Sequence, residues 1–161
     1  MDERSRFDGF LAQRATPYLA QHGFRRSGQR YRAARGRNTV VIRFQRRRAF
    51  FTCDLAVASA VLIDEFGDAP PEHWAIRLGS AVLGYDKWWD LAGDSAATAD
   101  DFLATLGRGV DLIEPIATDE GLRDAILGNV MRDGARGVPP IWEAWAITLI
   151  RHVGPGQWAT R

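Results

Sequence analysis

The chain of 161 residues has the length of one domain, and its 46% hydrophobic and 25% charged residues are the proportions of an ordinary globular protein. This composition excludes a disordered or fibrous chain, and no apolar run reaches the ~20 residues that span a bilayer. The polar start favours a cytoplasmic protein with no membrane partner, and the single cysteine, Cys53, excludes an internal disulfide.

The net charge of +1 conceals two halves of opposite sign. Residues 1–53 carry a charge of +10 and residues 54–161 carry −9. We expect the two halves to meet in the fold and neutralise one another. The alternative is a basic face for an anionic partner. All basic residues but one are arginine, so arginine content alone is a weak indicator of nucleic-acid binding.

An N-terminal helix is predicted first. Apolar residues recur at helical spacing between Phe7 and Leu19, and Gly23 stands where a left-handed residue would end the helix. Pro17 interrupts the pattern, because an interior proline removes a backbone hydrogen bond. The helix must therefore kink near Pro17 or restart there with Thr16 as its cap.

Three segments rich in β-branched and aromatic residues follow, at residues 29–34, 39–46 and 49–58. The short breaks RGRN and RR between them predict antiparallel hairpins. Because side chains alternate along a strand, one face is wholly apolar and the other is mixed. The mixed face groups four side chains across the second and third strands: Arg43, Gln45, Thr52 and Asp54.

After a loop containing the proline pair 70–71, residues 73–84 (HWAIRLGSAVLG) predict a fourth strand in which Arg77 faces away from the core. Residues 86–94 (DKWWDLAGD) predict a turn into a short fifth strand. Adjacent residues in a strand point to opposite sides, so only one of Trp88 and Trp89 can enter the core.

Three further helices complete the predicted elements. A capping box at Thr98 opens the first, which runs to Pro115. The second spans about residues 119–127 and stops at Gly128. The third is an apolar helix at residues 138–152, followed by a tail at 153–161.

Common catalytic and cofactor motifs are missing from the sequence. No P-loop, GxSxG or GxGxxG pattern is present, and His22, His73 and His152 lack the spacing of metal ligands. Cys53 lies on the apolar face of its strand, where burial disfavours a thiolate. We therefore predict no cofactor, no metal ion and no catalytic cysteine.

Five motifs occur in a particular order: HGFRRSGQRYR, VVIRFQRRR, FFTCDLAV, AIRLGSAV and DKWWDL. In this order and at these separations they resemble the bacterial family catalogued as domain-of-unknown-function family 4304, over about residues 8–125. The resemblance implies an α+β cytosolic domain and supplies no activity. Gln45, Asp54, Arg77 and Trp88 or Trp89 fall at the family's recognisable positions. Asp54-Leu55-Ala56 departs from the family's usual Asn-Leu-Gly.

We expect a single α+β domain over residues 1–161: an antiparallel sheet of four to six strands, with N-terminal and C-terminal helices packed on its apolar face. The favoured function is a non-enzymatic binding or protein-interaction module that holds a protein partner or a polar small molecule on the polar face. Its candidate binding residues are Arg43, Gln45, Asp54, Arg77, Trp88 and Trp89. The alternatives are a small enzyme with Asp54 as acid or base, and a nucleic-acid-binding protein that uses the arginine-rich hairpins.

Overall fold

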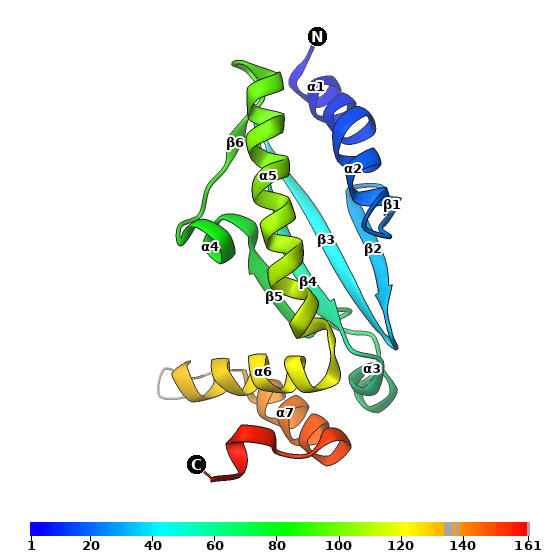
Figure 1. Ribbon diagram of the computed structural model, residues 1–161, viewed down its shortest axis with the longest axis vertical. Coiled ribbons are helices and arrows are strands. Elements are labelled where there is room, and N and C mark those ends of the chain that lie inside the picture. The colour runs from blue at the N-terminus through cyan, green and yellow to red at the C-terminus, as the bar shows by residue number, and fades with distance from the viewer. Residues whose placement is uncertain (134–136, 138, 161) are drawn as a thin grey trace.

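An antiparallel sheet and a set of helices make up the fold, which confirms the α+β class. The computed structural model describes residues 1–133, 137 and 139–160. The strands are β1 Arg25–Ser27, β2 Arg30–Arg35, β3 Asn38–Arg47, β4 Phe50–Ala58, β5 Trp74–Arg77 and β6 Trp89–Asp90. They lie in the order β1-β2-β3-β4-β5, and β6 pairs with the first residues of β4 (Figure 1).

Two-residue turns join the first four strands. Gly28 and Gly36 take positive φ values of 63° and 60°, which glycine adopts without strain. In the third turn Arg48 takes this conformation at φ 57°, so the turn is 48–49 and not the predicted 47–48. The three predicted strands are confirmed to within one residue at each end. Strand β1 was not predicted, because three polar residues carry no apolar alternation.

The N-terminal helix continues past the proline without a break. Helix α1 (Glu3–Phe10) leads into a π-helical segment, η1 (Leu11–Ala15), and then into α2 (Thr16–Ala20) with Pro17 in its first turn. Ala15 and Thr16 both have helical backbone angles, so the alternative of a restart with Thr16 as the cap is wrong. The Thr16 hydroxyl instead forms a hydrogen bond of 2.8 Å with the Tyr31 hydroxyl, which ties the helix to β2.

Two short helices stand where the sequence predicted a loop and a strand. Helix α3 (Ala60–Phe66) follows β4 and is capped by Ser59, whose side chain accepts a hydrogen bond from the Leu62 N–H. Residues 78–83 form helix α4 (Leu78–Leu83), so the predicted strand over 73–84 is correct only for β5. Apolar residues in LGSAVL fit a helical spacing as well as an alternating one, and the helical spacing prevails.

Helix α5 (Ser95–Ile113) begins three residues before the predicted Thr98, because Asp94 caps it. Thr98 instead donates its hydroxyl to the Asp90 carbonyl. A 3₁₀ turn, η2 (Glu114–Ala117), leads into helix α6 (Asp119–Asp133), which continues past the predicted stop at Gly128. Helix α7 (Pro140–Val153) confirms the predicted C-terminal helix, apart from residue 138, which lies outside the described residues. A final turn is η4 (Gly156–Thr160).

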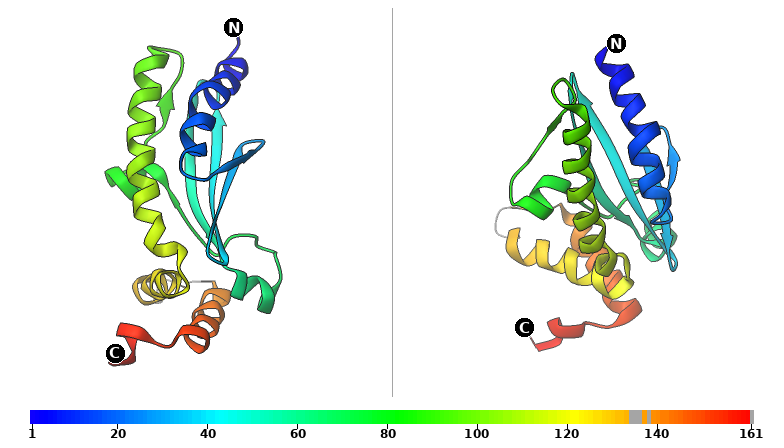
Figure 2. Two further views of the ribbon diagram at one scale, coloured as in Figure 1. Left: turned by 45° about the vertical axis from the view of Figure 1, so that its right-hand side comes forward. Right: turned by 45° about the horizontal axis from the view of Figure 1, so that its top comes forward.

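Helices α1, α2 and α5 lie across one face of the sheet (Figures 1 and 2). Phe10 of α1 and Phe102 of α5 pack against each other and against Phe44 and Phe51 of the sheet, with ring centroids 4.7 to 6.4 Å apart. Helices α6 and α7 pack on one another at the end of the sheet, and α7 also contacts α3. Among the described helices, none has the length and hydropathy needed to cross a membrane.

The two halves of opposite charge meet in the fold, as predicted. Ion pairs join arginines of the first 53 residues to carboxylates of the remaining chain: Arg14–Asp100, Arg30–Glu72, Arg35–Glu114, Arg37–Asp64 and Arg43–Asp54. Five of the thirteen arginines in residues 1–53 are therefore paired with carboxylates of the remaining chain.

Candidate functional site

A row of directly opposed residues crosses five strands on the face of the sheet that α1, α2 and α5 leave uncovered. Their register pairs each with the next: Ser27, Arg30, Arg43, Asp54 and Arg77. We call these five residues the polar row. Opposed residues in neighbouring strands share a face and lie about 5 Å apart, so their side chains can interact. The structure thus confirms that the predicted polar side chains share one face of the sheet and lie opposite one another on neighbouring strands.

Asp54 is the centre of the polar row. Its Oδ2 accepts a hydrogen bond of 2.7 Å from Gln45 Nε2 and lies 3.4 Å from Arg43 Nη2. Its Oδ1 accepts one of 2.7 Å from Arg77 Nε. The structure therefore brings four of the six predicted binding residues into one hydrogen-bonded cluster, and it fixes both arginines by their contact with one carboxylate.

Glu72 is a member of this network that the sequence did not reveal. Arg30 and Arg43 are directly opposed and would repel each other. Glu72 lies between them, with Oε1 3.3 Å from Arg30 Nη1 and Oε2 3.5 Å from Arg43 Nη1. Its side chain is only 7% exposed. Two opposed arginines require a counter-charge, but sequence spacing could not say that it comes from the loop before β5.

Trp88 borders the polar row at the end formed by Arg77. The Arg77 guanidinium carbon lies 5.3 Å from the centre of the Trp88 ring, a cation–π distance. Asp86 links the two, because its Oδ1 lies 3.4 Å from Arg77 Nη1 and its Oδ2 accepts a hydrogen bond from Trp88 Nε1. Arg77 is therefore held on three sides, by Asp54, Asp86 and Trp88.

Trp89 points to the other side of the sheet, as adjacent strand residues must. It is 2% exposed, packs edge-on against Phe102 at 5.0 Å and donates its indole N–H to Asp101. One tryptophan of the pair is thus in the core and the other at the rim. We remove Trp89 from the candidate site, because its side chain reaches no residue of the polar row.

Two adjoining hollows flank the middle of the polar row. One, of about 430 Å³, lies over it and is lined by Gln45 and Asp54 among others. The second, also about 430 Å³, lies toward α6 and α7 and includes Glu72. Arg30 and Arg43 line both hollows and form the wall between them.

Three side chains with acid-base or nucleophilic chemistry, Asp54, His73 and Cys53, are engaged by other groups or buried. The Asp54 oxygens already accept from three donors. His73 belongs to the second hollow, where its Nδ1 accepts a hydrogen bond from the Ser59 N–H and burial lowers its pKa to about 4. Burial, and then the nearby Asp54, raise the pKa of the Cys53 thiol well above its ordinary value. No group of three or more His, Cys, Asp or Glu among the described residues could hold a metal ion.

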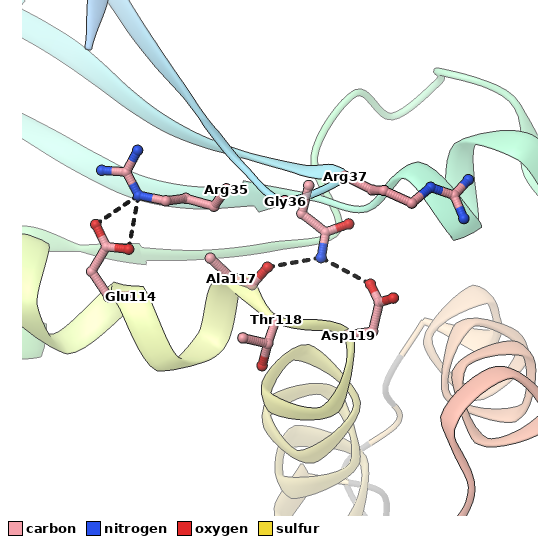
Figure 3. Close-up of a pocket in the computed structure, with 8 residues that line it drawn as sticks. Arg35, Gly36, Arg37, Glu114, Ala117, Thr118 and Asp119 are labelled. Atoms are coloured by element: carbon pink, nitrogen blue, oxygen red, sulfur yellow. Dashed lines mark hydrogen bonds and ion pairs between the residues drawn. The ribbon is translucent and has the colours of Figure 1, made fainter. Parts of the chain in front are cut away.

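A further hollow, of about 400 Å³, lies at the tip of the β2–β3 hairpin (Figure 3). Asn38 Nδ2 donates to the Ala117 carbonyl at 2.8 Å and to Asp119 Oδ1 at 2.9 Å. Arg35 Nε donates to both Glu114 oxygens, and the figure shows the two side chains pointing toward each other. We call these five residues the hairpin-tip clamp. Their polar groups hold the hairpin on the α5–α6 junction, so we assign them a structural role.

Nothing matched the chain in the comparisons with curated proteins and with solved structures. The sequence profile of the family described as Domain of unknown function (DUF4304) matches residues 15–106, which is more than half of the chain. The matched segment contains every described strand and the whole polar row, whereas α6 and α7 lie beyond it. The chain therefore belongs to the DUF4304 family, as its motifs predicted.

Proposed function

We propose that the chain is a non-enzymatic interaction module, which binds a partner protein through the polar row and Trp88. The observation that carries this proposal is that the Arg77 guanidinium is held in one orientation. Its guanidinium is held by Asp54, Asp86 and the Trp88 ring, yet 26% of its side chain remains exposed. An arginine that is ordered before binding loses little conformational freedom when it meets a carboxylate or a carbonyl of a partner.

The surroundings of the polar row support a protein partner. Phe50 lies on the same face of β4 as Asp54 and is 45% exposed. Tyr85, next to Asp86, is 57% exposed. Arginine and large aromatic residues are the types that contribute most to protein interfaces. The row also spans four strand spacings, about 19 Å, which suits a protein segment better than a small molecule.

Binding agrees with the geometry better than catalysis does. An acid or base needs a free oxygen or nitrogen directed at substrate, and the Asp54 oxygens are engaged by Gln45, Arg43 and Arg77. His73, the nearest candidate partner for acid-base work, has its Nδ1 engaged by the backbone at the start of α3. These contacts favour a recognition role for the Asp54 carboxylate, which orients two arginines.

Affinity capture with matched variants tests the proposal. Immobilised wild type, Arg77→Ala and Trp88→Ala are exposed to the same cell extract, and captured proteins are compared by mass spectrometry. Arg32→Ala is the control, because Arg32 is exposed on the same face of β2, opposite Val41, and has no ion pair among the described residues.

We expect one partner to be retained by wild type and Arg32→Ala and lost from both site variants. With that partner purified, calorimetry should show an affinity at least ~30-fold lower for Arg77→Ala, the loss typical of an interface hot spot of about 2 kcal/mol. Partners that bind Arg77→Ala as tightly as wild type would overturn the proposal.

A further inference from the structure

The hollow between the sheet and the C-terminal helices has features that the polar row does not explain. The sheet side contributes Arg43 and His73, α6 contributes Asn129, and α7 contributes Trp142 and Trp145. Its volume of about 430 Å³ falls in the range of sites for small molecules. It lies between the part of the chain that the family profile matches and the helices α6 and α7 that follow.

Two buried donors in the residues that line this hollow lack a partner. Trp145 is 3% exposed, and its indole Nε1 has no hydrogen-bond acceptor among the described residues. The same holds for Arg43 Nε. Folded proteins rarely leave buried N–H groups unpaired, because water is lost without a replacement. Two such groups beside one hollow indicate that an acceptor is supplied from outside the chain.

Other polar groups of the hollow also act as donors. His73 accepts from the Ser59 N–H through Nδ1, and its low pKa keeps the ring neutral at pH 7, so its proton resides on Nε2. Asn129 accepts from Arg132 through Oδ1, which leaves its amide nitrogen as a donor. The one carboxylate of the hollow, Glu72, is engaged by the two arginines beside it.

Charge and shape complete the description of the ligand. The charged residues that line the hollow are two arginines, Arg30 and Arg43, and one carboxylate, Glu72; Asp54, outside the lining, also contacts Arg43. Trp142, Ile126 and the proline pair 70–71 provide apolar walls. A flat apolar body with one negative, acceptor-bearing group would therefore match the hollow in charge, hydrogen bonding and surface.

We propose that this hollow binds a small aromatic carboxylate, with its ring against Trp142 and its carboxylate accepting hydrogen bonds from Trp145 and Arg43. This site goes beyond the proposed interaction function and shares only Arg30 and Arg43 with the polar row. Because both N–H groups are buried, the two side chains must turn toward the hollow when the ligand binds.

Calorimetric titration of the full chain with benzoate, indole-3-carboxylate and 2-naphthoate tests the proposal. We expect saturable binding of at least one, and at least tenfold weaker binding of the matching alcohol, which keeps the ring and lacks the charge. In ¹⁵N spectra the indole N–H signal of Trp145 should shift on binding; it is identified by its absence in Trp145→Phe.

Variants locate the site. Trp145→Phe keeps an aromatic side chain and should bind the carboxylate about tenfold more weakly. Asn129→Phe should fill the hollow from a half-exposed position and abolish binding, whereas Met131→Phe, 63% exposed on the same helix, should bind as wild type does. Arg77→Ala should also bind normally, which separates this site from the polar row. Absence of saturable binding of all three carboxylates would overturn the proposal, as would unchanged binding to folded Asn129→Phe.

Discussion

The hairpin-tip clamp and the polar row are both built from arginine, carboxylate and amide side chains, but they connect different parts of the fold. In the clamp, the buried Asn38 bonds the backbone and side chain of a helix junction about 80 residues away along the chain. In the polar row, Asp54 bonds side chains of the two neighbouring strands, β3 and β5, and Arg43 and Arg77 remain more than a quarter exposed. The clamp joins two layers of the fold, whereas the row joins strands that the backbone already pairs.

The two groups differ in what they connect and not in exposure, because Arg35 of the clamp and Arg77 of the row are both 26% exposed. A buried polar contact that joins distant elements, such as those of Asn38, helps to hold the fold, so its groups are unavailable to a ligand. An ion pair between paired strands adds little to a ladder of backbone hydrogen bonds, yet it orients guanidinium groups toward solvent. We therefore expect large stability effects at the clamp and large binding effects at the row.

The largest stability effect is expected at Asn38. Asn38→Ala removes two donated hydrogen bonds and the one that its Oδ1 accepts from the Ala60 N–H. Because each buried group left unpaired costs about 1–3 kcal/mol, we expect the free energy of unfolding in urea to fall by about 3–4 kcal/mol. Arg37→Ala, an exposed neighbour, should change it by less than about 0.5 kcal/mol. Equal effects of the two substitutions on the free energy of unfolding would contradict a structural role for the clamp.

A pH dependence is expected from His73. This residue lines the same hollow as Arg43 of the polar row, and its Nδ1 accepts a hydrogen bond from the backbone N–H of Ser59. Burial lowers its pKa from 6.5 to about 4. Between these values the unfolded chain binds a proton that the folded chain does not, so stability falls as pH decreases. The loss from pH 6.5 to 4 should be about 3 kcal/mol, and it should be absent in His73→Gln. Parallel stability curves for the two proteins would contradict this.

A smaller loss is expected at the polar row. Asp54→Asn leaves Arg43 and Arg77 without their shared charge. Because both arginines are partly solvated, we expect a loss of about 2 kcal/mol, below the 3–5 kcal/mol of a fully buried pair. Asp64→Asn, which breaks the exposed pair with Arg37, should cost less than about 0.5 kcal/mol. If Asp54→Asn lowered the free energy of unfolding as much as Asn38→Ala does, the polar row would have a structural role as well.

The smallest effect is expected at the exposed tip of the β3–β4 hairpin, at residues 46–48. Replacing its three arginines by alanine should leave the free energy of unfolding within about 0.5 kcal/mol of wild type. The wild-type protein should elute from a heparin column at low salt, since its arginines are largely offset by carboxylates. Retention to high salt, lost in the triple variant, would instead favour nucleic-acid binding.

Much of the polar row was predictable from the sequence for a physical reason. Alternation fixes which side chains share a face, and short turns fix the register, so Arg43, Gln45 and Asp54 could be grouped without a structure. Arg77 followed from the same alternation in β5. Pattern alone could not decide between Trp88 and Trp89, because that choice depends on how β6 pairs with β4.

The remaining features depend on contacts between distant segments. Glu72 lies in a proline-containing loop, where no periodicity indicates the direction of a side chain. Asn38 resembled an ordinary turn residue, because its partners, Ala117 and Asp119, lie on a helix junction far along the chain. Segment 78–83 fitted two periods equally well, and only its packing made it a helix.

The proposed binding of a partner protein involves the polar row and not the clamp. Calorimetry with the purified partner, at a temperature where all variants are folded, distinguishes the two regions. We expect Arg77→Ala to lose at least ~30-fold in affinity, whereas the less stable Asn38→Ala should bind as wild type does. Weaker binding by Asn38→Ala, together with unchanged binding by Arg77→Ala, would contradict it.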